Sequence, residues 1–417
     1  MTTPPAAAAA VQQRRTLRSL SAAQVLSGVG VASGVAAGSL MVAGVTGSES
    51  LAGLAQTSGV VGAAVAAVPL ARLSSSRGRR TGLVSGLLVA AAGAVVVIGG
   101  AVAESVFVVL LGTFLVGMAS AVTLQARYAA TDLAEPRHTA RDLSLVVWAT
   151  TVGAVAGPNL MQPASDLAVV LGLPRLSGPY LVTGSALVLA ALVVATRLRP
   201  DPLLMARQLR GEKVAPPHVA LSSSLRTVRA SAGATAGMTA IVLGHAVMVM
   251  VMVMTPVHMQ HVEVTLSVIG LVISVHILGM YVLSPVVGVV TDRLGPRTVV
   301  AAGGGTLLVA AAVAGTAPGG DVPRLGVGLF LLGLGWSETL VAGSALLTSS
   351  VVAADRPGVQ GAGDTVMNVG GAVAGASAGV VMAVGSYGWL NLLAAALVVP
   401  LVLGLVVERR RTGVSTA

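Results

Sequence analysis

Charged residues are so widely spaced in this chain that long apolar stretches lie between them. Six intervals of the first half contain no Asp, Glu, Lys or Arg: Arg18 to Glu49, Glu49 to Arg72, Arg80 to Glu104, Glu104 to Arg127, Asp142 to Asp166 and Arg175 to Arg197. A helix that crosses the hydrocarbon core of a bilayer needs about 20 apolar residues, and ionised side chains facing lipid are costly there. Each interval therefore predicts one transmembrane helix.

The second half repeats this pattern. After Arg229, charge-free stretches end at Glu263, Asp292 and Asp321, a fourth from Arg324 to Asp355 is broken only by Glu338, and the last runs from Asp364 to Glu408. The last stretch is long enough for two helices joined by a turn at residues 385–388. We expect an all-α membrane protein with twelve transmembrane helices. The composition agrees, since 55% of the residues are hydrophobic and only 10% are charged, too few for a water-soluble surface.

One long polar segment divides the chain into halves. Residues 199–229 contain Pro202, Pro216, Pro217 and a serine run. We predict an N-terminal six-helix bundle at 1–198, a central cytoplasmic loop at 199–229 and a C-terminal six-helix bundle at 230–417. Within the loop, residues 203–213 are compatible with a short amphipathic surface helix or with a flexible segment.

The halves also resemble each other. A shift of about 217 positions places Gly78 on Gly295 and Gly153 on Gly370. Two such repeats around a long loop indicate two pseudo-symmetric bundles, with a substrate site near the middle of the membrane. Glycines four residues apart, such as Gly30 and Gly34, predict close helix contacts, either static or sliding as the bundles rock.

Basic residues fall in alternate loops, which predicts cytoplasmic N- and C-termini in a bacterial cytoplasmic membrane. Only Arg175 and Arg324 fall on the other side. The net charge of +10 is therefore topogenic; nucleic-acid binding is excluded, because aromatic residues make up only 2% of the chain. The stretch at 19–48 is too long for a signal-peptide core, so we expect it to be retained as a helix. Without cysteine there is no disulfide or thiolate metal site, and we expect no cofactor or metal.

The loop before the ninth predicted helix contains Gly288, Asp292, Arg293, Gly295 and Arg297. This spacing resembles the loop signature of the major facilitator superfamily (MFS), whose fold has twelve helices in two bundles. Its glycines permit a tight turn, and its aspartate can pair with an arginine or with a helix N-terminus. The resemblance implies a cytoplasmic latch; the alternative is a topogenic loop whose surface ion pair contributes little. The equivalent loop of the first half keeps Gly78, Arg79 and Arg80 but has Ser75 at the aspartate position.

The fifth predicted helix contains Gly153, Gly157, Pro158 and Asn159. This sequence resembles the glycine-proline motif of the proton-driven exporters of the same superfamily, which implies a hinge rather than an ordinary proline kink. In the fourth helix, Thr113 stands where such exporters often have an arginine. Arg127, at the cytoplasmic end of that helix, is interpreted as a snorkelling topogenic residue or as an anion contact.

Three ionisable residues of the second half stand deep within predicted helices: His245, His276 and Glu338. Buried ionisable groups in membranes usually mark a substrate or ion path, and histidine exchanges protons near neutral pH. If the three converge, they would titrate as one coupled site. A histidine that only bonds to a backbone carbonyl is the alternative. We include Trp336 and Asn159 in the predicted cavity, and we expect Asp364 to form a structural pair.

The leading hypothesis is a proton-coupled exporter, an antiporter of small organic molecules that works by alternating access. The alternative is proton-coupled uptake of a nutrient or vitamin-like metabolite, and a non-transporting receptor or membrane enzyme is a remote third. ATP-driven transport is excluded, because the chain has no phosphate-binding loop of the Walker type. The expected partners are a small-molecule substrate, protons and the lipid bilayer, and we expect a monomer without enzymatic activity.

Overall fold

The computed structural model describes residues 4–46, 53–211, 220–260, 262–264 and 266–401. Contacts divide the chain into two compact units, the first comprising residues 1–135 and 145–221 and the second 136–144 and 222–417. The first unit contains all or most of eight α-helices: α1 (Pro4–Thr46), α2 (Gly53–Arg77), α3 (Arg79–Val102), α4 (Val106–Ala129), α5 (Thr139–Asn159), α6 (Met161–Val170), α7 (Gly178–Arg197) and α8 (Pro202–Leu209).

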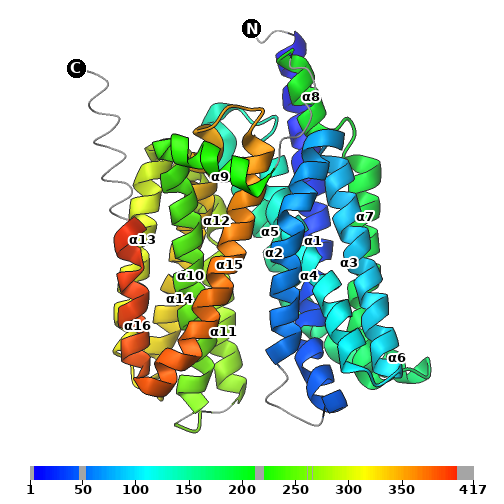
Figure 1. Cartoon of the computed structure of the whole chain (residues 1–417), viewed down its shortest axis with the longest axis vertical. Coiled ribbons are helices and arrows are strands. Elements are labelled where there is room, and N and C mark those ends of the chain that lie inside the picture. Colours follow the sequence, from blue (N-terminus) through cyan, green and yellow to red (C-terminus); the bar gives the residue numbers. More distant parts are fainter. Residues whose placement is uncertain (1–3, 47–52, 212–219, 261, 265, 402–417) are drawn as a thin grey trace. The chain divides into compact units, whose positions relative to one another are not determined.

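The second unit contains the remaining α-helices, coloured from green to red in Figure 1. These are α9 (Leu221–Ala230), α10 (Ala232–Gln260), α11 (Leu266–Tyr281), α12 (Ser284–Leu294), α13 (Pro296–Gly315), α14 (Val322–Ser349), α15 (Arg356–Val384) and α16 (Tyr387–Ala396). Two single-turn 3-10 helices, η2 (Pro136–His138) and η3 (Arg175–Ser177), precede α5 and α7. Among the described residues there is no strand.

Ten helical spans of the described part are long and apolar enough to cross a membrane. The bent pair α5 and α6 supplies an eleventh, and the apolar helix at Tyr387–Leu401 is shorter. The predicted turn between the last two spans is confirmed, because α15 ends at Val384 and α16 begins at Tyr387. The expected all-α architecture of twelve membrane helices is therefore confirmed.

The span predicted between Asp142 and Asp166 is not one straight helix. Its two parts meet at an angle of 56°, and the break follows Gly157, Pro158 and Asn159. Proline supplies no backbone N–H, so Pro158 removes one hydrogen bond from the last turn of α5, next to this break.

The central loop also contains helices. Residues 202–209 form α8, so the helical interpretation of this segment is confirmed, and α9 follows it at Leu221–Ala230. Asp201 caps α8, because its carboxylate accepts from the backbone N–H groups of Leu203 and Leu204. The boundary between the two units falls after residue 221 in the sequence, and the short segment 136–144 groups with the second unit. The predicted division into bundles at 1–198 and 230–417 around a loop at 199–229 stays a prediction. The middle of the loop and the basic tail at 409–411 lie outside the described residues.

Small residues set the closest helix contacts of the first unit. A Cβ on Gly153 would lie 2.5 Å from the Val25 oxygen and the Val29 nitrogen of α1, and the Ser33 hydroxyl donates to the Gly157 carbonyl at 3.0 Å. Because these obstacles are backbone atoms, no side chain fits at Gly153 unless α5 moves away from α1. A Cβ on Gly117 would likewise collide with the backbone of Gly59, where α4 crosses α2.

Candidate functional site

Three membrane spans of the second unit bring polar and aromatic side chains together near their middles, with Tyr281 at the end of α11. The Trp336 indole N–H donates to Nδ1 of His245 at 3.1 Å. The Tyr281 ring meets the Trp336 ring edge to face, with centroids 5.7 Å apart and an interplanar angle of 82°. His245, Tyr281 and Trp336 all lie near the middle of the spans that contain them, Ala232–Met259, Leu271–Leu294 and Val322–Ser349. We call these three residues the aromatic cluster.

A fourth helix contributes a glycine to this cluster. A Cβ on Gly371 of α15 would stand 2.7 Å from Cδ2 and 2.8 Å from Nε2 of His245. The imidazole therefore lies against α15 and contacts α14 through Trp336. Trp336 is 5% exposed, whereas His245 and Tyr281 are half-buried.

The hydrogen bond assigns the protons of the His245 ring. Indole nitrogen is a donor only, so Nδ1 of His245 must be the acceptor. In this arrangement the imidazole is neutral, with its proton on Nε2.

Glu338 lies on a different face of α14. It stands two residues after Trp336, which is about 200° around a helix. Its Cβ lies against Gly303 of α13, where the nearby Thr306 hydroxyl donates to the Ala302 carbonyl of its own helix at 3.1 Å. Oε2 of Glu338 is buried without a hydrogen-bond partner among the described residues.

The His276 ring hydrogen-bonds to a backbone carbonyl. Its Nδ1 lies 2.8 Å from the Leu329 carbonyl, so Nδ1 is the donor and the ring is held between α11 and α14. Leu329 is seven residues before Trp336, about two helical turns and 10 Å along α14. This contact matches the structural alternative considered for a membrane histidine. His245, His276 and Glu338 each contact a different partner in this structure, and their titration as one coupled site stays a prediction.

Two further candidates lie elsewhere. Asn159 is exposed at the end of α5 and donates to the carbonyl of Val155 in its own helix at 2.7 Å, so in this conformation it lies in the first unit and outside the aromatic cluster. Arg127 is 1% exposed, which differs from a snorkelling side chain. Its guanidinium bonds to the Tyr128 hydroxyl at 3.0 Å and lies over that ring.

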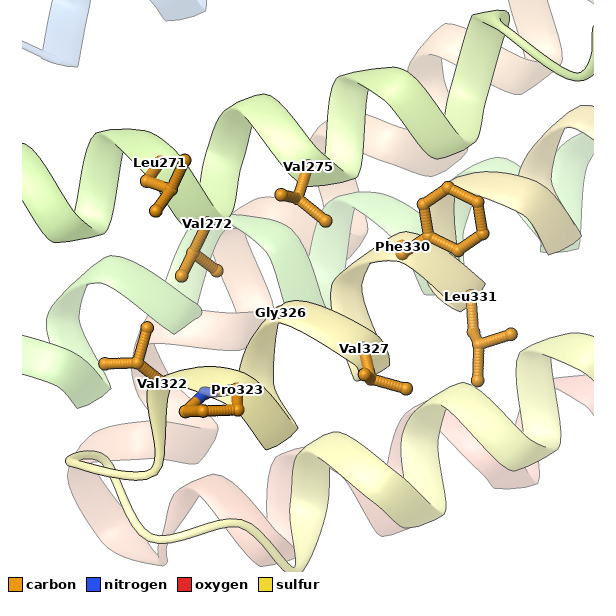
Figure 2. A pocket seen from close by; sticks show the side chains of 9 residues that line it. All are labelled: Leu271, Val272, Val275, Val322, Pro323, Gly326, Val327, Phe330 and Leu331. Atoms are coloured by element: carbon orange, nitrogen blue, oxygen red, sulfur yellow. The ribbon is translucent and has the colours of Figure 1, made fainter.

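A separate pocket of about 490 Å³ lies between α11 and α14, nearer the start of each helix. Figure 2 shows Leu271, Val272 and Val275 of α11 facing α14 residues such as Val327 and Phe330. All nine lining residues are apolar. Such a surface accommodates hydrocarbon but has no group that could orient a polar solute, so we do not assign it as the solute site.

The signature aspartate caps a helix. Both oxygens of Asp292, near the end of α12, accept backbone N–H groups in the first turn of α5: Ala140 N–H to Oδ1 and Arg141 N–H to Oδ2, each at 2.9 Å. One turn earlier, a Cβ on Gly288 would collide with the Ser144 hydroxyl. The first turn of a helix has unsatisfied donors and a positive dipole end, which favour a carboxylate. Residues 136–144 and α12 belong to the same unit, although α5 continues into the other.

The other signature residues have simpler places. Gly295 joins α12 to α13 with φ of 84°, a conformation that glycine adopts without strain. Arg293 and Arg297 are exposed. The Asp292 carboxylate therefore forms the cap, and Gly288, one turn earlier on α12, leaves room for the Ser144 side chain. Arg293 and Arg297 do not form it.

The equivalent loop of the first unit is held differently. Arg79 forms a bidentate ion pair with Asp132, at 2.8 and 3.1 Å, and both side chains are buried. Asp201 of the central segment accepts the Arg80 backbone N–H at 2.7 Å, and its carboxylate lies where a Cβ on Gly78 would be. Asp201 thus supplies a carboxylate to the start of α3.

Sequence reasoning missed the roles of Asp132 and Asp201. The pair Asp201-Pro202 was a usable signal, because an N-cap aspartate followed by proline at the first helical position is a common helix start. Nothing local to Asp132 indicates its partner 53 residues away.

Comparisons with known proteins identify the family. The model of the Major Facilitator Superfamily matches residues 20–265 and 237–416. The uncharacterized MFS-type transporter YdeG of Bacillus subtilis is 39% identical over 380 residues, covering 91% of this chain and 88% of the relative. The riboflavin transporter RfnT of Brucella anthropi is 30% identical over 356 residues, covering 83% and 84%.

Solved structures have the same fold. The fucose:proton symporter FucP of E. coli superposes with a TM-score of 0.69 at 14% identity, covering 94% of this chain and 98% of the symporter. The human organic anion transporter MFSD10 gives a TM-score of 0.72 at 15% identity, covering 94% and 99%. The chain is therefore a multi-pass membrane protein, a transporter of the MFS type, and belongs to the Major Facilitator Superfamily.

Proposed function

We propose that this chain is a proton-coupled secondary transporter of small organic solutes that works by alternating access. The observation that supports this most directly is the His245–Trp336 hydrogen bond at the middle of two membrane spans. Ionisable residues at that depth are rare and usually mark a substrate or ion path. Transporters of this architecture bind their solutes near the bilayer midplane.

Within this proposal, His245 is the coupling group in preference to Glu338 and His276. Glu338 faces α13, and His276 is fixed to a backbone carbonyl. His245 contacts two other helices and an indole that a solute could also use.

Efflux by antiport remains our first proposal for direction. The support is the helix break after Pro158, at the motif that resembles the exporters' hinge. A coupling role for this break predicts that Pro158→Ala changes the ratio of protons to solute more than it changes the yield of folded protein. An unchanged ratio of protons to solute in this variant would contradict a hinge role for Pro158.

Uptake of a vitamin-like metabolite is the second proposal. It is supported by the 30% identity to a protein named as a riboflavin transporter. Substrate accumulation by sealed vesicles under imposed pH gradients of both signs distinguishes the two. Accumulation inside vesicles with an acidic exterior indicates symport, accumulation inside vesicles with an acidic lumen indicates antiport, and transport that ignores the gradient contradicts proton coupling altogether.

The cellular setting is part of the same proposal. We place the protein as a monomer in a bacterial cytoplasmic membrane with both termini in the cytoplasm, since basic residues fall in alternate loops. Protease accessibility of tags at each terminus tests the orientation.

A further inference from the structure

We propose that Trp336 and Tyr281 form the binding surface for a planar, ring-bearing solute, and that protonation of His245 releases Trp336 to that solute. This inference rests on the proposed function, because it names the solute class and the residue that links solute to proton. The chain has only three tryptophans and four tyrosines. The contact of Trp336 with both Tyr281 and His245 therefore brings scarce aromatic residues together at one mid-membrane position.

The first step concerns the hydrogen bond. Nδ1 of His245 accepts the indole N–H at 3.1 Å. A proton arriving at Nδ1 takes the lone pair that accepts this bond, and two N–H groups would then point at each other. Protonation and the His245–Trp336 bond therefore exclude each other.

The second step concerns access to the indole. While the bond is intact, Trp336 is 5% exposed, and the Tyr281 ring packs against it at an interplanar angle of 82°. A flat solute needs an open aromatic face for stacking. The released indole provides that face, so proton and solute favour the same conformation and each must strengthen the binding of the other. Such positive coupling is what symport requires, so this inference rests on the uptake proposal and not on efflux by antiport.

The helices packed against α10 carry other titratable or charged groups, whose positions are as follows. On α14, Glu338 faces α13; on α11, His276 contacts Leu329; on α15, Asp364 and Arg356 lie about two and four turns before Gly371. On α16, Tyr387 bonds to Thr255 of α10 and stacks on His258. On α13, Arg297 is the second residue.

The release of Trp336 can be followed without any solute or gradient. The other two tryptophans, Trp148 and Trp389, are 41% and 62% exposed, so both should tolerate replacement by phenylalanine. The double replacement leaves Trp336 as the sole tryptophan. In nanodiscs we expect its fluorescence to titrate once between pH 5 and 8, where histidine changes charge. His245→Gln keeps an acceptor for the indole but cannot titrate, so its fluorescence should stay constant, whereas His276→Gln should still titrate. A flat profile with His245 present, or a titration that survives His245→Gln, overturns the switch.

The solute class is tested by binding of three planar probes of different charge: riboflavin, ethidium and fluorescein. At least one should bind about fivefold more tightly at pH 5.5 than at pH 8, the effect of one hydrogen bond. Trp336→Leu should weaken that binding about tenfold, the value of one aromatic stack, and His245→Gln should remove its pH dependence. Absence of binding by all three, or tighter binding at pH 8, overturns the inference; proton-coupled transport of another solute would leave the proposed function intact.

Discussion

Asp292 connects α12 to the first turn of α5 through two hydrogen bonds of 2.9 Å. A charged cap of this kind contributes about 1 kcal/mol, or roughly a fivefold shift between two conformations. We therefore expect Asp292→Asn to open this contact more often and to slow turnover, with solute affinity nearly unchanged.

The absence of cysteine gives a clean measurement of that opening. Ser144 is buried against Gly288, so Ser144→Cys introduces a sole thiol that a maleimide reaches only when the contact opens. Labelling should be about fivefold faster with Asp292→Asn and unchanged with Arg293→Gln, whose side chain is exposed. Equal rates in all three proteins would remove the latch role.

Arg79 and Asp132 form a buried ion pair with 1% and 6% exposure of the two side chains. Removing one partner leaves a buried charge without compensation, so Asp132→Asn should cost about 3–5 kcal/mol of stability. Thermal unfolding in detergent measures this loss, with Arg77→Gln, an exposed neighbour, as the control. If both variants melt at the wild-type temperature, the pair is not part of the structural framework.

At this scale, sequence could identify residues but not their partners. Asp292 was recognisable from its loop signature, and a helix N-terminus was among its possible partners. His245 and Glu338 were recognisable as charges within apolar spans. The contact of His245 with Trp336 and not with Glu338 was not, because it depends on the rotation of α14 against α10 and α13, which no local pattern specifies.

At the scale of the elements, α5 packs closely against α1. Gly153 approaches the backbone of α1 too closely for any side chain, because a Cβ would lie 2.5 Å from two backbone atoms. Gly153→Ala should therefore reduce the yield of monodisperse protein severalfold, since overpacking of this kind costs about 1–3 kcal/mol.

Gly99→Ala is the matched control for this prediction, because nothing lies within 4 Å of a Cβ at that position. Fluorescence-detected gel filtration of tagged protein compares the two. Similar yields for both variants would show that α5 can move away from α1 without penalty.

The spans themselves were predictable, because a charge-free interval of about 20 residues has one main solution in lipid. The break in α5 was predictable in position from Gly157 and Pro158, but its 56° angle was not. The inclusion of residues 136–144 in the second unit was also beyond sequence reasoning, since it arises from the contacts of one short segment with α12.

For the whole molecule, the account holds that a proton gradient drives solute movement and that His245 couples the two. Loss of the coupling group separates uphill from downhill transport, because the solute site and the alternating conformations remain. Replacing Glu338, which faces α13, should affect neither uphill nor downhill transport strongly.

The most direct test imposes a pH gradient on proteoliposomes and follows proton and solute movement together in wild type, His245→Gln and Glu338→Gln. The account predicts that His245→Gln abolishes accumulation against a gradient while downhill exchange continues, and that Glu338→Gln accumulates solute much as the wild type does. Uphill transport that survives in His245→Gln with wild-type rate and pH dependence, or that is lost only in Glu338→Gln, would contradict it.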